Sequence, residues 1–321
     1  MNFIITGATG FIGQNIITQL LRDNHYIIAL VRPTSKHKLQ THSHIKLLEG
    51  NLSEITQKHL PYPLDSYRLI HLAWDDLPNY HSMVHLESHL MQHYFFIKQV
   101  IQLGIKNVTI TGTCFEYGLQ NGLLTEEMQT NPQNPYAMAK DFLHKMLQQL
   151  NLHIPFQLKW LRLWYMFGKG QNTKSLLAQL QQAIDSGADE FAMSKGEQLR
   201  DYLPVEQVAS LIIKSAINNS FTGVLNICSG SPVSINSVVE NYLSQTNQTI
   251  KLNKGAYPYN TYEPMAFWGD NKKLLQLTRG GGGVTRPYHN PATFLPTIPL
   301  FLFHSFQTSC FSSILTDRRA I

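Results

Sequence analysis

The chain has 321 residues, of which 43% are hydrophobic and 15% charged, as in a folded protein with a sizeable core and one large or two modest domains. Its formal net charge is +5, but residues 279–321 carry +3 of this, from Arg279, Arg286, Arg318 and Arg319 against Asp317. The rest of the chain is nearly neutral, so we expect no nucleic-acid partner.

Cysteine usage and the first residues bear on the compartment. Cys114, Cys228 and Cys310 are an odd number without Cys-x-x-Cys spacing, which argues against a disulfide framework and a structural zinc site. The chain reaches a glycine motif at once without a basic leader, and no apolar run is long enough to span a membrane. We expect a cytoplasmic protein.

The first half alternates short apolar runs with longer amphipathic segments, the pattern of βαβ units. It predicts strands at 3–6, 26–31, 45–48, 68–72, 107–111 and 157–163, with helices at 13–22 and 83–103. The fold class is therefore α/β: a Rossmann, doubly wound parallel sheet over residues 1–163.

Beyond residue 163 the texture changes, and helices at 173–186 and 205–218 and a strand at 224–227 are predicted. We expect residues 164–278 to form mainly a smaller α/β substrate domain, with segments that return to the Rossmann domain. Residues 279–321 open with four glycines after Arg279 and contain four prolines, which predicts a loosely ordered tail.

A glycine turn follows the first predicted strand and opens a helix. In the segment TGATGFIG at 6–13, Gly7 permits a tight turn, Gly10 lets the backbone approach a pyrophosphate, and Gly13 allows close packing of the helix on the strand. The helix N-terminus favours the negative charge. This context predicts a dinucleotide site that includes Phe11 and Ile12.

The residue after the second strand bears on the choice of cofactor. A site that prefers NAD places an Asp or Glu there for the ribose hydroxyls, but this chain has Arg32. A guanidinium suits a 2′-phosphate, so we expect a preference for NADP, with NAD possible.

Tyr136 and Lys140 lie four residues apart at the start of a helical run and therefore share one helix face. A tyrosine becomes an acid–base group near pH 7 when a neighbouring cation stabilises its phenolate. Thr111 and Thr113 end the fifth strand, where a hydroxyl can bond the same substrate oxygen. The set predicts transfer of a hydride and a proton.

With these motifs in place, residues 1–277 resemble the extended short-chain dehydrogenase/reductases, specifically the NAD-dependent epimerase/dehydratase family that acts on nucleotide sugars. The segments that carry the resemblance are TGATGFIG at 6–13, HLAW at 71–74, TGTCFEYG at 111–118, PYAMAK at 135–140, LRLWYMFGKGQ at 161–171 and LRDYLPVEQVA at 199–209.

The resemblance implies roles for individual residues. Thr113, Tyr136 and Lys140 form the catalytic triad, and Arg200 falls where the family places an arginine on the substrate diphosphate. Tyr165 stands where many 4-epimerases carry an asparagine beside the sugar. The remaining implied cofactor contacts are Asn51 and Leu52 near the adenine, where the family usually has Asp-Leu, and Leu72 and Ala73.

The residues after Thr113 narrow the reaction within the family. Sugar 4,6-dehydratases have Asp-Glu where this chain has Cys114 and Phe115, and the fucose-forming epimerase-reductases need a cysteine at position 115. Reductases of 4-keto-6-deoxy nucleotide sugars are the most similar, so we expect C4 redox chemistry in deoxysugar and O-antigen (lipopolysaccharide) biosynthesis. A nucleotide-sugar 4-epimerase and a non-catalytic NADP-binding sensor remain alternatives.

His81, His85, His89 and His93 recur every four residues along one helical stripe. The spacing could ligate a metal, but no HExxH motif or further ligand cluster accompanies it, so we expect no metal site and a partly solvated or interface stripe. The resemblance implies a homodimer built on this helix. If the histidines lie in its interface, dimerisation weakens as pH falls through about 6.5.

Overall fold

The computed structural model of the protein describes residues 1–259 and 263–279. Seven parallel strands form the main sheet in the order β11-β7-β5-β4-β1-β2-β3. Its strands are β1 (Asn2–Thr6), β2 (Tyr26–Val31), β3 (Ile45–Glu49), β4 (Tyr67–His71), β5 (Asn107–Thr113), β7 (Gln157–Leu163) and β11 (Gly223–Ile227). The order reverses between β1 and β4, so the predicted doubly wound α/β fold is confirmed.

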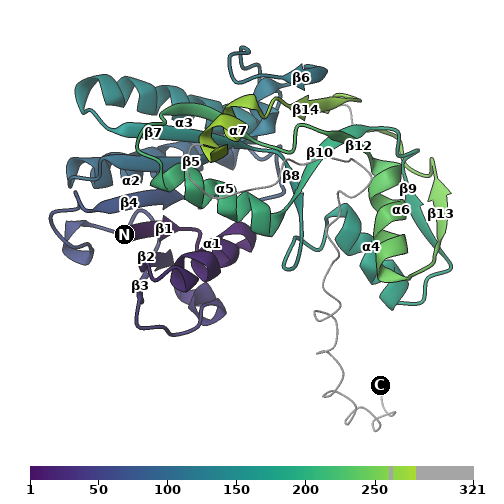
Figure 1. Ribbon diagram of the computed structural model, residues 1–321, viewed down its shortest axis with the longest axis horizontal. Helices are drawn as coiled ribbons and strands as arrows, with labels where there is room; N and C mark the ends of the chain where they lie inside the picture. The colour runs from purple at the N-terminus through teal and green to yellow at the C-terminus, as the bar shows by residue number, and fades with distance from the viewer. Residues whose placement is uncertain (260–262, 280–321) are drawn as a thin grey trace, which may run out of the picture.

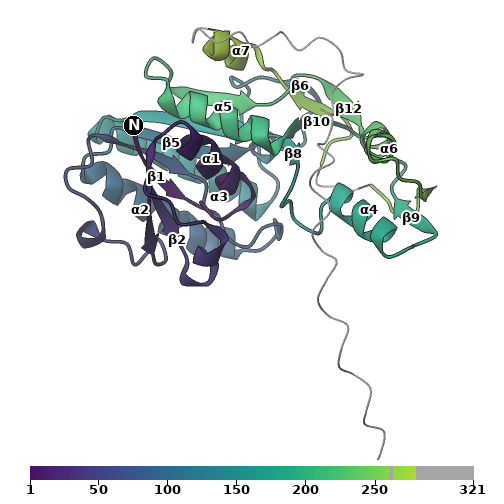
Figure 2. The same ribbon diagram turned by 60° about the horizontal axis from the view of Figure 1, so that its bottom comes forward.

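Two pairs of helices cover the sheet. On one face α1 (Phe11–Arg22) packs against α5 (Val205–Ile217), and on the other α2 (Leu90–Gln102) packs against α3 (Pro135–His153), as Figures 1 and 2 show. Each helix turns an apolar stripe to the strands, and Ile16 and Leu20 of α1 are fully buried. Both faces of the sheet are thus covered, which explains why its inner strands read as continuous apolar runs.

A second lobe lies at the carboxyl ends of the strands, to the right in Figure 1. It holds a sheet of β8 (Tyr165–Phe167), β10 (Leu199–Pro204) and β12 (Pro232–Ser234), and also α4 (Leu176–Asp185), β9 (Glu190–Met193), α6 (Ile235–Thr246) and β13 (Lys251–Lys254). A small ribbon pairs β6 (Gly122–Leu124) with β14 (Phe267–Gly269), and α7 (Lys272–Arg279) follows.

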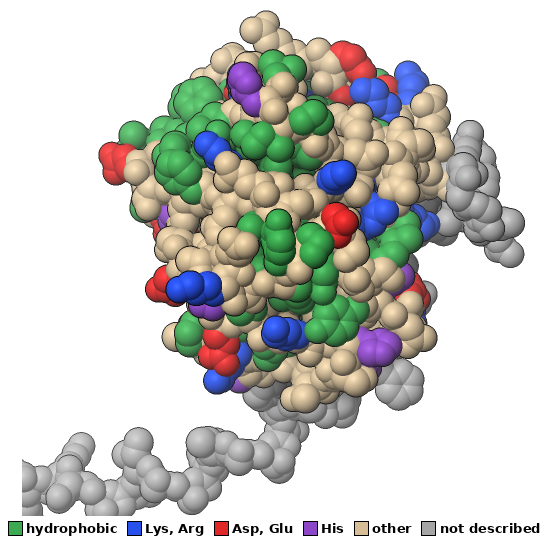
Figure 3. All heavy atoms as spheres, turned by 90° about the vertical axis from the view of Figure 1, so that its left-hand side faces the viewer, with side chains coloured by type: hydrophobic (Ala, Val, Ile, Leu, Met, Phe, Trp, Pro, Cys, Tyr) green, Lys and Arg blue, Asp and Glu red, His purple; other side chains and the backbone are tan. Residues whose placement is uncertain are grey.

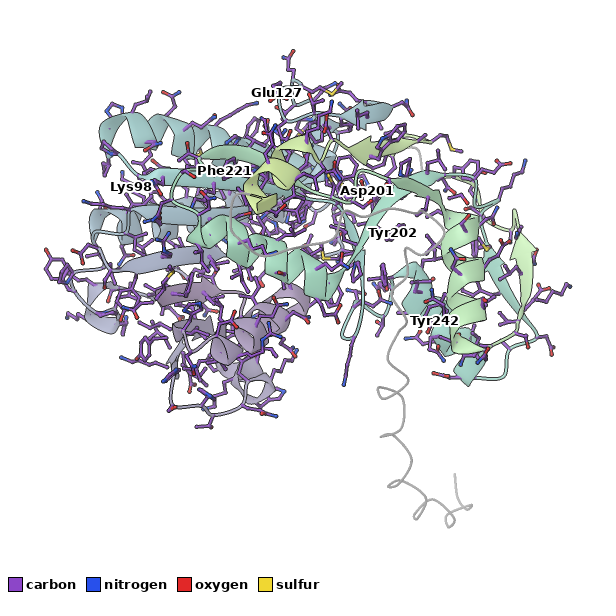
Figure 4. The ribbon with its side chains drawn as sticks, in the orientation of Figure 1. Lys98, Glu127, Asp201, Tyr202, Phe221 and Tyr242 are labelled. Atoms are coloured by element: carbon purple, nitrogen blue, oxygen red, sulfur yellow. The ribbon has the colours of Figure 1, made fainter. Side chains whose placement is uncertain are left out.

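Strand β10 fastens the two lobes together. Figure 4 shows Asp201 and Tyr202 on it, between the main sheet and the second lobe. The buried Asp201 carboxylate accepts hydrogen bonds from the backbone N–H groups of Ser229 (2.7 Å) and Gly230 (2.9 Å), just after β11. After β10 the chain returns to the main sheet, where α5 packs on one face and β11 forms an edge strand.

The helix predicted at 83–103 begins with the π-helical turn η3 (His85–His89) and continues as α2. Three short 3-10 turns are η1 (Pro33–Lys38), η2 (Gln57–His59) and η4 (Cys114–Tyr117). Among the described helices, none is long and apolar enough to cross a membrane. From residue 280 on, the predicted tail lies outside the described residues.

The surface in Figure 3 is the face at the left of Figure 1. Its Lys and Arg side chains are scattered, with acidic side chains among them, and no broad basic area forms on this face. This distribution fits the nearly neutral body of the chain and offers nothing that tracks a phosphate backbone there.

Candidate active site

The glycine turn lies where β1 meets α1. Gly7 has a φ of +70°, and a Cβ at this position would lie 2.8 Å from the backbone nitrogen of Ala73. A Cβ on Gly13 would lie 2.2 Å from the Gly7 carbonyl oxygen. Gly10 precedes α1 and is exposed. The turn therefore presents bare backbone and a helix N-terminus at the strand-order reversal, which is a cradle for a pyrophosphate.

Helix α3 positions the tyrosine and the lysine. Asn134 caps the helix by accepting a hydrogen bond from the Ala137 N–H (2.9 Å), and Pro135 occupies its first position. The helix thus starts one residue before Tyr136, and the next turn carries Lys140 on the same face. The Lys140 ammonium donates to the Thr111 carbonyl oxygen at the end of β5 (2.8 Å).

Thr113 is held from below by a buried ion pair. The Glu116 carboxylate accepts from the Thr113 N–H (2.8 Å), and the Thr113 hydroxyl accepts from the Phe115 N–H (3.3 Å). Glu116 also pairs with Arg162 of β7 (2.8 Å) and accepts from the Trp160 indole N–H (3.0 Å). Sequence reasoning missed Glu116, although Thr113-x-x-Glu116 is the spacing of a capping box.

Burial moves the two titratable groups of the triad in opposite directions. It raises the pKa of Tyr136, helped by the nearby Tyr80, Glu116 and Cys114, whereas the Thr113 side chain lowers it. Burial also lowers the pKa of Lys140 to about 7, and the charge of Glu116 opposes this shift. Both shifts disfavour charge in this dry part of the site, which makes the environment of the ammonium decisive for phenolate formation.

A cavity of about 760 Å³ opens above these groups, between the main sheet and the second lobe. Its size suits a small-molecule ligand. From the main sheet, its connecting loops and its covering helices, the lining includes Phe11, Ile12, Leu72, Trp74, Thr111, Thr113, Tyr136 and Lys140. From the rest of the chain it includes Tyr165, Gln171, Asn172, Lys174, Tyr202 and Glu263. Thr113, Tyr136, Lys140 and Tyr165 therefore meet at one cavity.

The residues predicted at the adenosine end lie along the ends of β2 and β3. Arg32 is exposed and its guanidinium pairs with Asp75 (2.9 Å). The Asn51 side-chain amide donates to Glu54 (3.0 Å), and Leu52 packs against the hydrophobic core. Arg32 thus already has a carboxylate partner that sequence reasoning missed, because Asp75 follows a different strand.

Arg200 is set back from the cavity. It is 3% exposed, and its guanidinium donates to the Glu263 carboxylate at 2.8 Å. Glu263 and Tyr165 line the cavity in front of it, with the Arg200 guanidinium carbon 5.7 Å from the centroid of the Tyr165 ring. The guanidinium thus already has a carboxylate partner in Glu263, which the sequence pattern around Arg200 does not reveal.

Cys114 and Cys228 are buried free thiols, and burial raises the pKa of both. Cys310 lies outside the described residues.

The expectation of a solvated or interface histidine stripe is wrong for its two buried members. His85 and His93 are 0% and 1% exposed and face the interior beneath Trp74, whereas His81 is exposed. Rings so enclosed cannot contribute to a subunit interface, so His85 and His93 offer no basis for an acid dissociation of a dimer. No group of metal-binding side chains occurs among residues 1–259 and 263–279.

Comparison with known proteins agrees with this geometry. The chain is 33% identical over 272 residues to the dTDP-6-deoxy-L-talose 4-dehydrogenase (NAD(+)) of Aggregatibacter actinomycetemcomitans, covering 84% of this chain and 99% of that protein. The fold matches the UDP-N-acetylglucosamine 4-epimerase of Methanobrevibacter ruminantium M1 (TM-score 0.76, 21% identity, 86% of this chain and 91% of that chain). It also matches MoeE5 in complex with UDP-glucose and NAD (TM-score 0.71, 22% identity, 86% and 91%).

The glycine turn and the triad also lie within the match to a family model. The model of the NAD dependent epimerase/dehydratase family covers residues 3–228, from the first strand to the end of the last strand of the main sheet. The six segments by which the sequence resembles this family all fall inside that range, and we conclude that the chain belongs to the NAD dependent epimerase/dehydratase family.

Proposed function

We propose that the protein is an NAD(P)-dependent oxidoreductase that reduces, or in reverse oxidises, C4 of a 4-keto-6-deoxy nucleotide sugar. One observation carries the proposal: Thr113, Tyr136 and Lys140 meet at a cavity of about 760 Å³ beside the glycine turn. The 33% identity to a dTDP-6-deoxy-L-talose 4-dehydrogenase, nearly end to end, supports the substrate class. CDP-abequose synthases, which the sequence also resembles, carry out related chemistry.

The residues fit a dinucleotide. Gly7, Gly10 and Gly13 leave the turn free of side chains where a Cβ on Gly7 or Gly13 would collide with backbone, and the α1 N-terminus faces the same place. The other residues proposed to hold the cofactor are Phe11, Ile12, Arg32, Asn51, Leu52, Leu72, Ala73, Tyr136 and Lys140. When bound, the nicotinamide supplies the hydride for C4 or accepts it.

The protein's own groups manage the proton. During reduction of the ketone, Tyr136 donates its phenolic proton to the developing C4 alkoxide, and Thr113 holds the same oxygen by a hydrogen bond. The Lys140 ammonium stabilises the phenolate that Tyr136 leaves behind. In the direction of oxidation the same phenolate takes the proton from the alcohol. Tyr165 lies beside the sugar, and Arg200 receives the diphosphate after release of Glu263.

The cofactor preference has two opposing indications. A cation at Arg32 and the lack of a carboxylate at that position favour NADP. The pair between Arg32 and Asp75 weakens this preference, and the 33% identical relative is named for NAD(+). We therefore propose that NADP is preferred over NAD by a small margin, which Asp75 sets.

The assembly and the compartment follow from the surface and the composition. Exposed apolar side chains on α2 and α3, among them Phe95 (58% exposed) and Phe142 (46%), support a homodimer through these helices. We also propose residues 1–163 as the cofactor domain, 164–278 as mainly the substrate domain, and the cytoplasm as the compartment.

A panel of dTDP-, CDP-, GDP- and UDP-4-keto-6-deoxyhexoses, each assayed with NADH and NADPH, tests the function. Stoichiometric consumption of reduced cofactor with one member supports the proposal, and interconversion of sugars without net cofactor consumption supports the 4-epimerase instead. Tyr136→Phe should abolish turnover while cofactor binding persists. Cofactor binding without turnover of any sugar would identify a sensor.

A further inference from the structure

Trp74 is a large aromatic residue beside the triad to which the proposed mechanism gives no role. It follows β4 and lines the cavity. Its ring stacks on the His93 ring with a centroid distance of 4.4 Å and an interplanar angle of 9°, and its indole N–H donates to His85 Nδ1 (3.2 Å). His89 meets it edge-on at 6.2 Å. Three members of the histidine stripe thus fix the plane of the indole.

The histidines that hold Trp74 are themselves anchored. His85 Nε2 hydrogen-bonds the Asn79 carbonyl oxygen (3.0 Å), and because Nδ1 accepts from the indole, Nε2 carries the proton. His93 Nδ1 is 2.8 Å from His71 Nε2, and His71 Nδ1 is 2.9 Å from the Thr6 hydroxyl at the end of β1. The network therefore ties the indole to the first strand, directly before the glycine turn.

The indole in turn meets the catalytic lysine. The Lys140 ammonium lies 4.1 Å from the centroid of the Trp74 ring, well inside the range of a cation–π contact. Lys140 is 1% exposed and, within residues 1–259 and 263–279, no carboxylate forms an ion pair with it. A desolvated ammonium gains the most from an aromatic face, and tryptophan offers the strongest one.

We propose that Trp74 is a positioning residue for Lys140: the indole face holds the ammonium charged and in place beside Tyr136, and the histidines at 85, 89 and 93 hold the indole. The effect on catalysis rests on the proposed oxidoreductase function, whereas the effect on the lysine itself does not. These three histidines then act as a scaffold for the indole within the active-site wall.

The titration of the neighbouring groups leaves Lys140 as the one to observe. The groups that surround it are His71 from β4, His93 from α2, Tyr136 from α3 and Glu116 from η4. Burial lowers the pKa of His71 to about 3 and that of His93 well below its usual value, and it raises the pKa of Tyr136. Burial also raises the pKa of Glu116, and Lys140, with a pKa of about 7, is the group whose titration the experiment follows directly.

The His89 ring meets the indole edge-on. Burial lowers the pKa of His89, against the opposing charges of Asp75 and Asp76. Removal of the indole therefore acts on the ammonium chiefly through loss of the aromatic face, and the ammonium should lose its proton at lower pH.

The test measures the pKa of Lys140 directly in protein without cofactor or substrate. Lysine labelled with ¹³C at Cε is followed by NMR between pH 6 and 9, with the signal assigned through Lys140→Arg. Trp74→Leu should lower the pKa of Lys140 by about one unit, a tenfold weaker hold on the proton, and Trp74→Phe should lower it by less than half as much. Phe96→Leu is the matched control. It removes a buried aromatic ring that stacks on His71 at a centroid distance of 5.8 Å, and it leaves the Trp74 ring in contact with Lys140.

In the catalytic assay, the alkaline limb of the kcat profile should shift to lower pH by the same amount in Trp74→Leu and not in Phe96→Leu. An unchanged pKa of Lys140 in folded Trp74→Leu overturns the proposal. If Trp74→Leu fails to fold, Trp74→Met provides the same comparison with a side chain of intermediate volume. A lowered pKa in a protein that turns over no nucleotide sugar supports the positioning role and refutes the proposed function alone.

Discussion

The buried pair of Glu116 and Arg162 offers the sharpest link between fold and site. We consider Glu116→Gln, which keeps the shape of the side chain and removes its charge. Both partners are almost fully enclosed, at 0% and 3% exposure. Burial raises the pKa of Glu116, and the guanidinium bonded at 2.8 Å opposes the rise. The substitution leaves the Arg162 charge without its partner inside the protein.

An amide cannot satisfy the contacts that the carboxylate accepts. One Glu116 oxygen receives the Thr113 N–H and the other the Arg162 Nε–H, while the Trp160 indole N–H lies between them at 3.1 and 3.0 Å. Either orientation of a glutamine amide points its NH₂ at one of these donors. Breaking such a buried pair costs about 3–5 kcal/mol, and we expect that loss in the free energy of unfolding.

Urea unfolding followed by circular dichroism measures this loss. Glu190→Gln serves as the control, since it makes the same change on the exposed pair between Lys251 and Glu190 and should leave the midpoint unchanged. Combining Glu116→Gln with Arg162→Met should recover part of the stability, because it removes the unpaired charge. A loss below about 1 kcal/mol in Glu116→Gln would refute the reasoning.

Three further predictions concern the cofactor site and the lysine. Gly13→Ala should destabilise the protein by about 1–3 kcal/mol in urea unfolding, because its Cβ would lie 2.2 Å from the Gly7 carbonyl oxygen. Gly10→Ala has its nearest contact at 3.2 Å, so its free energy of unfolding should stay within about 0.5 kcal/mol of the wild-type value. Gly10→Ala should weaken only cofactor binding, measured by fluorescence titration. Asp75→Asn should raise the ratio of kcat/KM for NADPH over NADH about 5- to 10-fold, because it removes the carboxylate that pairs with the Arg32 guanidinium. An unchanged ratio would mean that Arg32 does not contact the 2′-phosphate. Lys140→Met should have a higher free energy of unfolding than wild type below pH 7, and this advantage should shrink toward pH 9 by at most about 1.4 kcal/mol per pH unit. The reason is that the pKa of Lys140 is about 7 in the folded protein and 10.5 in the unfolded chain, so between these values only the unfolded chain keeps the proton and the wild type gains stability as pH rises. Parallel curves of unfolding free energy against pH would contradict this prediction.

Local patterns carried most of the fold and the triad. The glycine turn, the seven strands of the main sheet and the placement of Tyr136 four residues before Lys140 depend on short stretches of sequence, in which glycine conformation and side-chain period decide the structure. Asn134 and Pro135 even mark the first turn of α3. These features were predictable because few distant contacts compete with them.

The buried histidines and the ion-pair partners of Arg32 and Arg200 were not predictable from local sequence. A histidine every fourth residue reads as a solvated stripe, and the structure buries two of the four because Trp74 and His71 arrive from another strand to receive them. The pairs of Arg32 with Asp75 and of Arg200 with Glu263 likewise join residues 43 and 63 positions apart. The sequence does not show which polar side chains are buried, because their burial depends on hydrogen-bonding partners that only the fold brings together.

The origin of each active-site residue separates chemistry from specificity. Thr113, Tyr136 and Lys140 all belong to the layer formed by the main sheet and its covering helices. There the capping of η4 and α3 and the hydrogen-bonded histidines that contact Trp74 hold them in a packed core. Tyr165 and Glu263 enter the cavity from beyond that layer. Because packed elements tolerate little change in volume while surface segments vary more freely, one triad can serve different sugars as the second lobe changes. The proposed diphosphate site, Arg200 with its partner Glu263, likewise comes from segments other than those that carry the triad.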